Sequence, residues 1–372
     1  MSEEALPEAD RVPGAPHPRE TLRLFGQDAA QRDFLQALNA DRLHHGWLIT
    51  GPLGVGKATL AWQIARFLLA TAGEADGGLF GGPPQYDSLQ VDPDHPAARR
   101  IAARSEPGLF SITRTVNEKT GRLRDQIVID DIRGLTHFLH MSSAEGGRRV
   151  VIVDAADDMN MNAANGLLKM LEEPPARTTL LLISHQPSRL LPTIRSRCRE
   201  LRLHPLSPED MHAALQQAGL EVEETPALAE LSAGSVGEAL RLVRLGGMEM
   251  YQHLVALFST MPGFDRQQAL KLAEAAAQRG AADKFELLLT LIDTFVTRLA
   301  RTGATGQPPL VEAAPGEAAL LSRLAPNAHK AREWAVAAQE ITDRSRHGQA
   351  VNLDPAALVL DTVFRIQKTA SA

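Results

Sequence analysis

The sequence predicts an α/β fold in which a sheet core carries a phosphate-binding loop and is followed by helical segments. Three observations carry this prediction. Between about residues 20 and 205, short apolar strands alternate with longer amphipathic helices, as an α/β sheet domain requires. A glycine-rich stretch separates one such strand from the next helix. Beyond Pro205 the chain becomes rich in alanine and leucine at helical spacing.

The apolar pattern predicts which segments of the core are strands and which are helices. We expect buried strands where short apolar runs stand between turn residues, and a helix where apolar residues recur every three or four positions. The predicted strands are Gly46–Thr50, Gln126–Ile129, Arg149–Val153 and Leu180–Ser184, and the clearest helix is Lys57–Ala70. Asp130 is the expected N-cap of the helix that follows the second strand. Residues 71–124 are predicted to form an irregular loop, because glycine and proline are frequent there.

Composition shifts divide the chain into four segments. Residues 1–19 are acidic and proline-rich, lack the apolar centre of a signal peptide and are predicted to be disordered. Residues 20–205 form the predicted core, residues 206–246 a small helical domain, and residues 247–372 a longer helical domain.

The overall composition excludes several classes of protein. Hydrophobic content of 44% suffices for buried cores, and the net charge of −6 gives no general attraction for nucleic acid. The single cysteine, Cys198, excludes an intramolecular disulfide and suits a reducing compartment. No apolar run reaches the roughly 20 residues that cross a bilayer, so the expected location is the cytoplasm, without membrane contact.

The glycine-rich loop GPLGVGK predicts a nucleotide site. It follows a strand and opens a helix, so its backbone N–H groups and the helix N-terminus can meet phosphate oxygens. The candidate nucleotide-binding residues in it are Gly51, Gly54, Gly56 and Lys57, whose amine can reach the β- and γ-phosphates.

Two positions weaken this site for catalysis. Ala58 stands where a Ser or Thr hydroxyl ligates magnesium, and the next candidate, Thr59, is rotated about 100° around the helix. Asp154, at the end of a predicted strand, can hold a hydrated metal, but the following residue is Ala155 rather than a glutamate that polarises water. Losing a general base costs about 10²- to 10⁴-fold in rate. ATP binding therefore stays possible, whereas hydrolysis is not expected.

Two further motifs resemble those of one family. The run NGLLKMLEEPP at 165–175 and the run TIRSRCR at 193–199 are similar, in order and approximate spacing, to segments of the clamp-loader subunits of bacterial DNA polymerase III. The resemblance extends from about Leu22 to Leu206 and is weaker beyond. It implies an AAA+ (RecA-like) core, a small helical lid and a helical collar that joins the subunits.

The resemblance also assigns roles. In this family the arginine of the Ser-Arg-Cys motif completes the ATP site of a neighbouring subunit, so Arg197 is the expected catalytic residue, acting in trans. The hydrolysing gamma and tau subunits carry three features that are absent here, where Ala58, Ala155 and Gly237 stand. This combination is typical of the family's non-hydrolysing subunit. Many relatives also have a four-cysteine zinc module after the loop helix. Residues 71–124 hold no cysteine and only His95, so neither zinc nor another metal is expected.

The implied partners are the gamma or tau and delta subunits, the sliding clamp and primed DNA. On charge pattern alone, Arg195, Arg197 and Arg199 are ordinary solvated charges, and Cys198 is a packing residue. Three alternatives remain open: a gamma- or tau-like subunit that hydrolyses ATP, an unrelated P-loop enzyme such as a kinase or helicase, and a nucleotide-free scaffold.

Overall fold

The computed structural model describes residues 8–73, 84–117, 119–140, 147–223, 225–263, 265–278 and 280–371. They divide into two compact units. The core unit comprises the residues up to Glu221 together with Ser235–Gly237, and the helical unit comprises Val222–Gly234 with the residues from Glu238 on. The segment 206–246, predicted as a lid, is shared between the two units, so the division into core, lid and collar stays a prediction.

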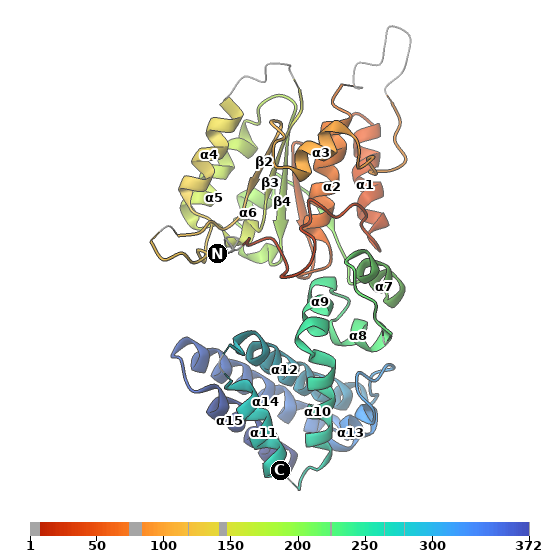
Figure 1. Ribbon diagram of the computed structural model, residues 1–372, viewed down its shortest axis with the longest axis vertical. Helices are drawn as coiled ribbons and strands as arrows, with labels where there is room; N and C mark the ends of the chain where they lie inside the picture. The colour runs from red at the N-terminus through yellow and green to blue at the C-terminus, as the bar shows by residue number, and fades with distance from the viewer. Residues whose placement is uncertain are drawn as a thin grey trace, which may run out of the picture. The chain divides into compact units, whose positions relative to one another are not determined.

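The core unit is built on a five-stranded parallel sheet with the strand order β2-β3-β4-β1-β5. The strands are β1 (Gly46–Thr50), β2 (Leu109–Ile112), β3 (Arg149–Val153), β4 (Thr178–Ser184) and β5 (Arg199–Arg202). Helices cover both faces, with α4 and α5 on one side and α1, α2 and α3 on the other (Figure 1). The predicted α/β class is thus confirmed.

The helices of the core unit follow the strands as short crossovers require. Their bounds are α1 (Asp28–Asn39), α2 (Lys57–Ala70), α3 (Pro96–Ala102), α4 (Ile129–His140), α5 (Met161–Glu172), α6 (Pro192–Arg195) and α7 (Pro208–Gln217), with 3₁₀ turns at Ala156–Asp158 and Pro187–Arg189. The central strands β3 and β4 are apolar on both faces because each face packs on helices. On one face, α4 and α5 place Leu135 and Leu167 against Val151 and Leu180.

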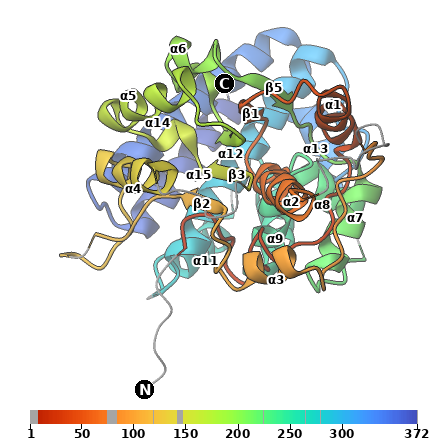
Figure 2. The same cartoon turned by 90° about the horizontal axis from the view of Figure 1, so that it is seen from above.

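The helical unit contains α8 (Thr225–Leu231), most of α9 (Val236–Leu245), α10 (Gly247–Ser259), α11 (Arg266–Ala276), α12 (Ala282–Thr305), α13 (Glu317–Leu324), α14 (Ala328–Ala350) and α15 (Pro355–Ser371). Figure 2 shows the same helices from above. A buried charge network ties four of them together, α8, α10, α12 and α13. The Arg298 guanidinium donates to Glu317 and to Glu230 on α8, at 2.7 and 2.9 Å, and the Tyr251 hydroxyl donates to Glu317 at 2.5 Å. Glu317 is fully buried, so its charge depends on these donors.

Three local predictions are wrong. Residues 126–129 form no strand: Ile127 makes an isolated bridge to Met159, and α4 already begins at Ile129, so Asp130 lies in its first turn rather than at its N-cap. The stretch 71–124 contains both α3 and the edge strand β2. Here tertiary pairing with β3 and packing on α2 outweigh the local glycine and proline signal.

The expectation of a disordered N-terminus is also wrong for residues 8–19; residues 1–7 lie outside the described ranges. His17 is 1% exposed, and its imidazole contacts the Trp62 ring edge-on and shares a 3.0 Å hydrogen bond with Asp10. The Arg66 guanidinium on α2 donates to the Arg19 carbonyl at 2.7 Å. Composition does not reveal such specific contacts, which is why the segment looked disordered. Within the described ranges, no helix combines the length and the apolar character that crossing a membrane requires.

Candidate functional site

The glycine loop lies at the carboxyl end of β1, where it connects directly to α2 (Figure 1). In open α/β sheets this edge is where ligands bind. Gly54 has φ +76°, a conformation that favours glycine, and a Cβ at this position would lie 2.3 Å from the Ser235 hydroxyl oxygen. Gly51 is equally confined, since a Cβ there would lie 2.6 Å from the Leu203 carbonyl oxygen. The loop therefore has the predicted backbone, and neighbouring chain packs tightly against it.

Lys57 does not extend into open space from this loop. Its ammonium donates to the carbonyl of Gly51 at 2.8 Å and also to that of Pro52, and the residue is 3% exposed. Burial lowers the pKa of Lys57 to about 8, against the opposing effect of the Asp154 and Asp157 charges. The cation that would meet a nucleotide's phosphates is thus held by the loop's own carbonyl oxygens.

Asp154 follows the last residue of β3 and lies at the same edge of the sheet, as predicted. Burial raises its pKa to about 7, the negative charge of Asp10 adds to that effect, and Lys57 opposes it. At neutral pH this carboxyl is therefore divided between its neutral and ionised forms. A magnesium ligand must be ionised, so a metal bound here would have to displace this proton.

The residues present do not fit a catalytic magnesium site. Ala58 in the first turn of α2 has no hydroxyl, and Ala155, next to the strand-end acid, is 4% exposed and has no carboxylate. Thr59 is half-buried one residue further along the helix and so points in a different direction from Ala58. The loop therefore lacks two of the groups that ATP hydrolysis requires.

Two side chains at this edge had no distinct signal in the sequence. Asp157 accepts hydrogen bonds from the backbone N–H groups of His185 and Gln186, at 3.1 and 3.2 Å, and so holds the end of β4. Burial and the Lys57 charge lower the pKa of His185 to about 4. The position of His185, directly after a buried strand, was the available signal.

The segment Ser235–Gly237 closes over the glycine loop from another direction. The Gly237 N–H donates to the Gly54 carbonyl at 3.1 Å, and a Cβ on Gly237 would lie 3.1 Å from the Gly54 Cα. Val12 of the N-terminal segment lies on the same side, 3.8 Å from that Cβ position. A Cβ at position 237 would therefore be tight against the Gly54 backbone, which gives a physical reason for glycine at this position.

Arg197 lies at the other end of β1. The carbonyl oxygen of Arg197 is 3.2 Å from the Cβ position of Gly46, the first residue of the strand, whereas the glycine loop follows Thr50, the last. Gly51, the first residue of the glycine loop, is five steps of about 3.3 Å along the chain from Gly46, so the two lie roughly 16 Å apart. The structure therefore groups the predicted nucleotide-binding residues at one edge of the sheet and places Arg197 near the opposite edge.

The Arg197 side chain is held in a defined position at the surface. Its guanidinium donates to the Thr193 carbonyl at 3.0 Å and pairs with the Glu172 carboxylate at 2.8 Å, and 36% of the side chain is exposed. These two contacts leave the remaining donors of the guanidinium available. Thr193 belongs to α6, and Glu172 ends α5, so two elements fix one arginine.

The neighbours of Arg197 have other environments. Arg195 is exposed, and Arg199 stacks over the Trp47 ring at 5.2 Å. Cys198 is half-buried, and burial raises its pKa to about 12, so its thiol is not a nucleophile at neutral pH.

These features define a P-loop protein of the α/β class, in which the loop between β1 and α2 is retained and an arginine is exposed at the far end of the same strand. Residues 26–207 match the family model described as DNA polymerase III, delta subunit.

The chain is also similar to curated proteins with related names. The chain is 36% identical to DNA polymerase III subunit delta' of Pseudomonas aeruginosa over 62% of its length and 65% of the relative's. It is 34% identical to the subunit of the same name from Escherichia coli, over 55% of each chain. It is 26% identical to DNA polymerase III subunit tau of Escherichia coli, over 76% of this chain and 41% of that one. The matches thus span less than two thirds of these relatives.

Proposed function

We propose that this chain is a delta-prime-like subunit of a clamp loader, which helps to place a sliding clamp on primed DNA and supplies Arg197 to the ATP site of a neighbouring gamma or tau subunit. The partners would be those subunits, a delta subunit, the clamp and the DNA. The location would be the cytoplasm, where bacterial chromosomes are replicated. The observation that carries the proposal is the position of Arg197: exposed, held by Thr193 and Glu172, and near the opposite end of β1 from this chain's own glycine loop.

The chemistry required of Arg197 is electrostatic. When the γ-phosphoryl group passes to water, negative charge spreads over its equatorial oxygens, and a fixed guanidinium stabilises that charge without forming a covalent bond. A finger supplied in trans contributes about 10³- to 10⁵-fold to the rate. Roughly 16 Å along β1 is too far for Arg197 to reach a phosphate in its own loop. Its substrate contact must then be in another subunit.

The state of the chain's own loop supports the non-hydrolysing role. The Lys57 ammonium is engaged by the Gly51 and Pro52 carbonyls, and Ala58 and Ala155 stand where a metal ligand and a glutamate would be needed. A gamma- or tau-like subunit that hydrolyses ATP is the second candidate, favoured only by the similarity to tau subunits. Turnover by the isolated chain would support that candidate instead.

The test is ATP turnover by the reconstituted loader, stimulated by clamp and primed DNA, with Arg197→Ala in this subunit. We expect turnover at the neighbouring site to fall by about 10³-fold. Arg195→Ala is the matched control, because it removes an exposed arginine two residues away that has no ion pair among the described residues.

Gel filtration establishes whether each variant still assembles. A large loss with Arg197→Ala, and none with Arg195→Ala, in intact complexes supports the proposal. Equal turnover of both variants in intact complexes would show that Arg197 is not a trans finger.

A further inference from the structure

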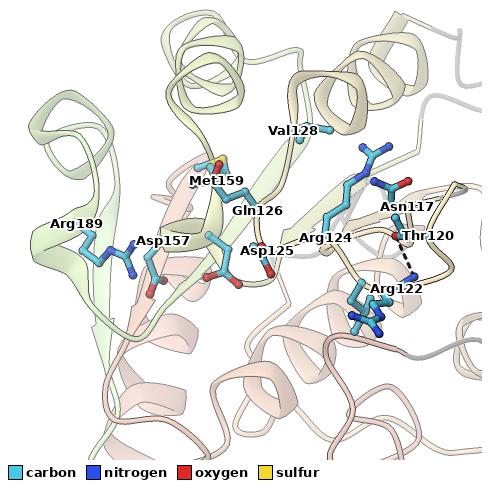
Figure 3. Close-up of a pocket in the computed structure, with 12 residues that line it drawn as sticks. Asn117, Thr120, Arg122, Arg124, Asp125, Gln126, Val128, Asp157, Met159 and Arg189 are labelled. Carbon is cyan, nitrogen blue, oxygen red and sulfur yellow. Dashed lines mark hydrogen bonds between the residues drawn. The ribbon is translucent and has the colours of Figure 1, made fainter. Parts of the chain in front are cut away.

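The carboxyl edge of the sheet has an open pocket of about 1180 Å³ in which charges of both signs are present. Figure 3 shows Arg189 and Asp157 on one side of it, with Arg122 and Arg124 on the other. Its charged lining consists of three arginines and three aspartates: Arg122, Arg124, Arg189, Asp125, Asp157 and Asp158. Such a lining favours neither an anion nor a cation. The amino edge of the same sheet, around Arg197, has more specific contacts.

The end of α5 depends on a hydrogen-bond donor from outside the helix. The last four carbonyl groups of a helix have no partner within it. The residue four positions after Leu171 is Pro175, which has no N–H to donate. The His45 imidazole takes this role, since its Nε2 lies 3.0 Å from the Leu171 carbonyl oxygen. The motif at 165–175 therefore ends its helix with a carbonyl that a residue distant in the sequence satisfies.

His45 is fixed at the start of β1 and donates in its neutral form. Its backbone carbonyl accepts from the Leu180 N–H at 2.7 Å, and its ring stacks on that of His44 with the centroids 4.4 Å apart. Burial lowers the pKa of His45, and the neighbouring His44 adds to that effect, so the imidazole is neutral at neutral pH. Because a carbonyl oxygen only accepts, the single N–H of the ring must be at Nε2.

Three segments meet at Gly46. A Cβ on this residue would lie 3.0 Å from the Leu171 side chain and 3.2 Å from the Arg197 carbonyl oxygen. The start of β1 thus packs against both the last turn of α5 and the turn that carries Arg197. A shift of α5 at this point would move Glu172, whose carboxylate contacts the Arg197 guanidinium at 2.8 Å.

We propose that His45 is a positioning residue for Arg197. It holds the last turn of α5, and that turn carries Glu172, whose carboxylate holds the guanidinium. The proposal rests on the proposed function, because the position of Arg197 affects turnover only if this arginine acts at a neighbouring ATP site. The effect passes through one carboxylate, so it cannot exceed the effect of removing that carboxylate.

The test is ATP turnover by the reconstituted loader, with assembly established by gel filtration. His45→Leu removes the donor, whereas His45→Gln keeps an N–H at the same number of bonds from the main chain. We expect His45→Leu to lower kcat by about twofold to fivefold, the range for a partly exposed charge pair, with KM unchanged. His45→Gln should restore most of the loss. If Arg197→Ala lowers kcat and His45→Leu does not, the proposal is overturned and the proposed function stands.

His44→Leu is the matched control, because the His44 ring nitrogen contacts the backbone of Gly46 rather than α5. Equal losses with His44→Leu and His45→Leu would overturn the proposal, since the effect would then come from the start of β1 alone. The double variant His45→Leu with Glu172→Gln should lose no more kcat than Glu172→Gln does. Additive losses would also overturn it, because His45 would then act by another route.

Hydrogen exchange of the chain alone tests the contact without any turnover. Mass spectrometry of peptides that span residues 165–176 should show faster exchange at the end of α5 with His45→Leu and the original rate with His45→Gln. Unchanged exchange with His45→Leu would overturn the proposal. If Arg197→Ala leaves turnover unchanged in an intact loader, the proposed function fails and the positioning role of His45 fails with it. The Arg197→Ala result therefore distinguishes the two failures.

Discussion

The two ends of β1 differ in how they use their polar groups. At the carboxyl end, the glycine loop closes on itself: Lys57 donates to carbonyls of its own loop, and Gly237 donates to Gly54. At the amino end, Arg197 is held by two elements and still exposes its guanidinium. The comparison indicates that one strand can carry, at one end, a loop whose polar groups bond to each other and, at the other end, an exposed cation.

This contrast gives the glycines of the loop a role in stability. Leu203, Ser235 and Gly237 approach the loop to within contact distance of the places where Cβ atoms would stand. Such close packing is lost if a side chain is added, whether or not a phosphate ever binds. The loop motif can therefore persist for reasons of packing alone.

Gly54→Ala is expected to have the largest effect on stability. The new Cβ would lie 2.3 Å from the Ser235 hydroxyl oxygen and 3.0 Å from the Gly237 nitrogen, at a φ of +76°. The control Gly121→Ala has a similar φ of +66° but nothing within 4 Å of its Cβ position. The difference between the two variants then isolates the packing contribution.

Urea unfolding should show that Gly54→Ala lowers the free energy of unfolding by about 2 kcal/mol more than Gly121→Ala does. Equal losses would mean that only the backbone conformation matters and that the loop is not packed against Ser235–Gly237 in solution.

Asp154→Asn should change how stability depends on pH. The folded-state pKa of Asp154, about 7, lies above the ordinary value of 3.8, so the folded chain binds the proton more tightly than the unfolded chain does. The stabilisation from this group is complete below about pH 3.8 and is lost as pH rises through 7. Asparagine does not ionise, so the Asp154→Asn variant does not lose stability through this group as the pH rises. Lys57, whose pKa of about 8 is lowered from 10.5, contributes only at higher pH.

The measurement is the melting temperature of both chains at intervals between pH 5 and 7.5. The melting temperature of the unmodified chain should fall relative to that of Asp154→Asn as pH rises across this range. Parallel curves would show that folding does not raise the pKa of Asp154.

Much of the core could be predicted from the sequence because its signals are local. Apolar runs bounded by turns marked β1, β3 and part of β4, and the glycine loop fixed the start of α2. The edge strand β2 could not be predicted, because its order comes from pairing with β3 rather than from its own pattern. The N-terminal segment was missed for a related reason: His17 and Arg19 are ordered by Asp10, Trp62 and Arg66, and composition does not report such partners.

In the candidate site, too, local features could be predicted from the sequence, whereas side-chain contacts could not. The glycine loop, Lys57 and Asp154 were predicted to lie together, and they do, because strand ends meet at one edge of a parallel sheet. The direction of the Lys57 ammonium could not be predicted from the sequence, because it depends on which acceptors lie nearest in the folded chain. The same holds for Glu172, whose contact with Arg197 joins two motifs that are separate in the chain.

Glu172→Gln is expected to have the smallest effect and tests how Arg197 is positioned. The carboxylate of Glu172 contacts the guanidinium of Arg197, so we infer that it is a positioning residue. The pair is partly exposed, and such pairs contribute up to about 1 kcal/mol, which corresponds to roughly a fivefold change in rate. In the reconstituted loader, kcat for ATP should fall by up to this factor while KM stays unchanged.

Glu173→Gln is the control, because that neighbour is exposed and has no ion pair among the described residues. Glu172→Asp keeps the charge and should restore part of the lost kcat. A rise in kcat with Glu172→Gln would contradict this interpretation. It would show that the Glu172 carboxylate competes with the neighbour's phosphates for Arg197. Arg197 would then be engaged by a group of its own chain, as Lys57 is in the glycine loop.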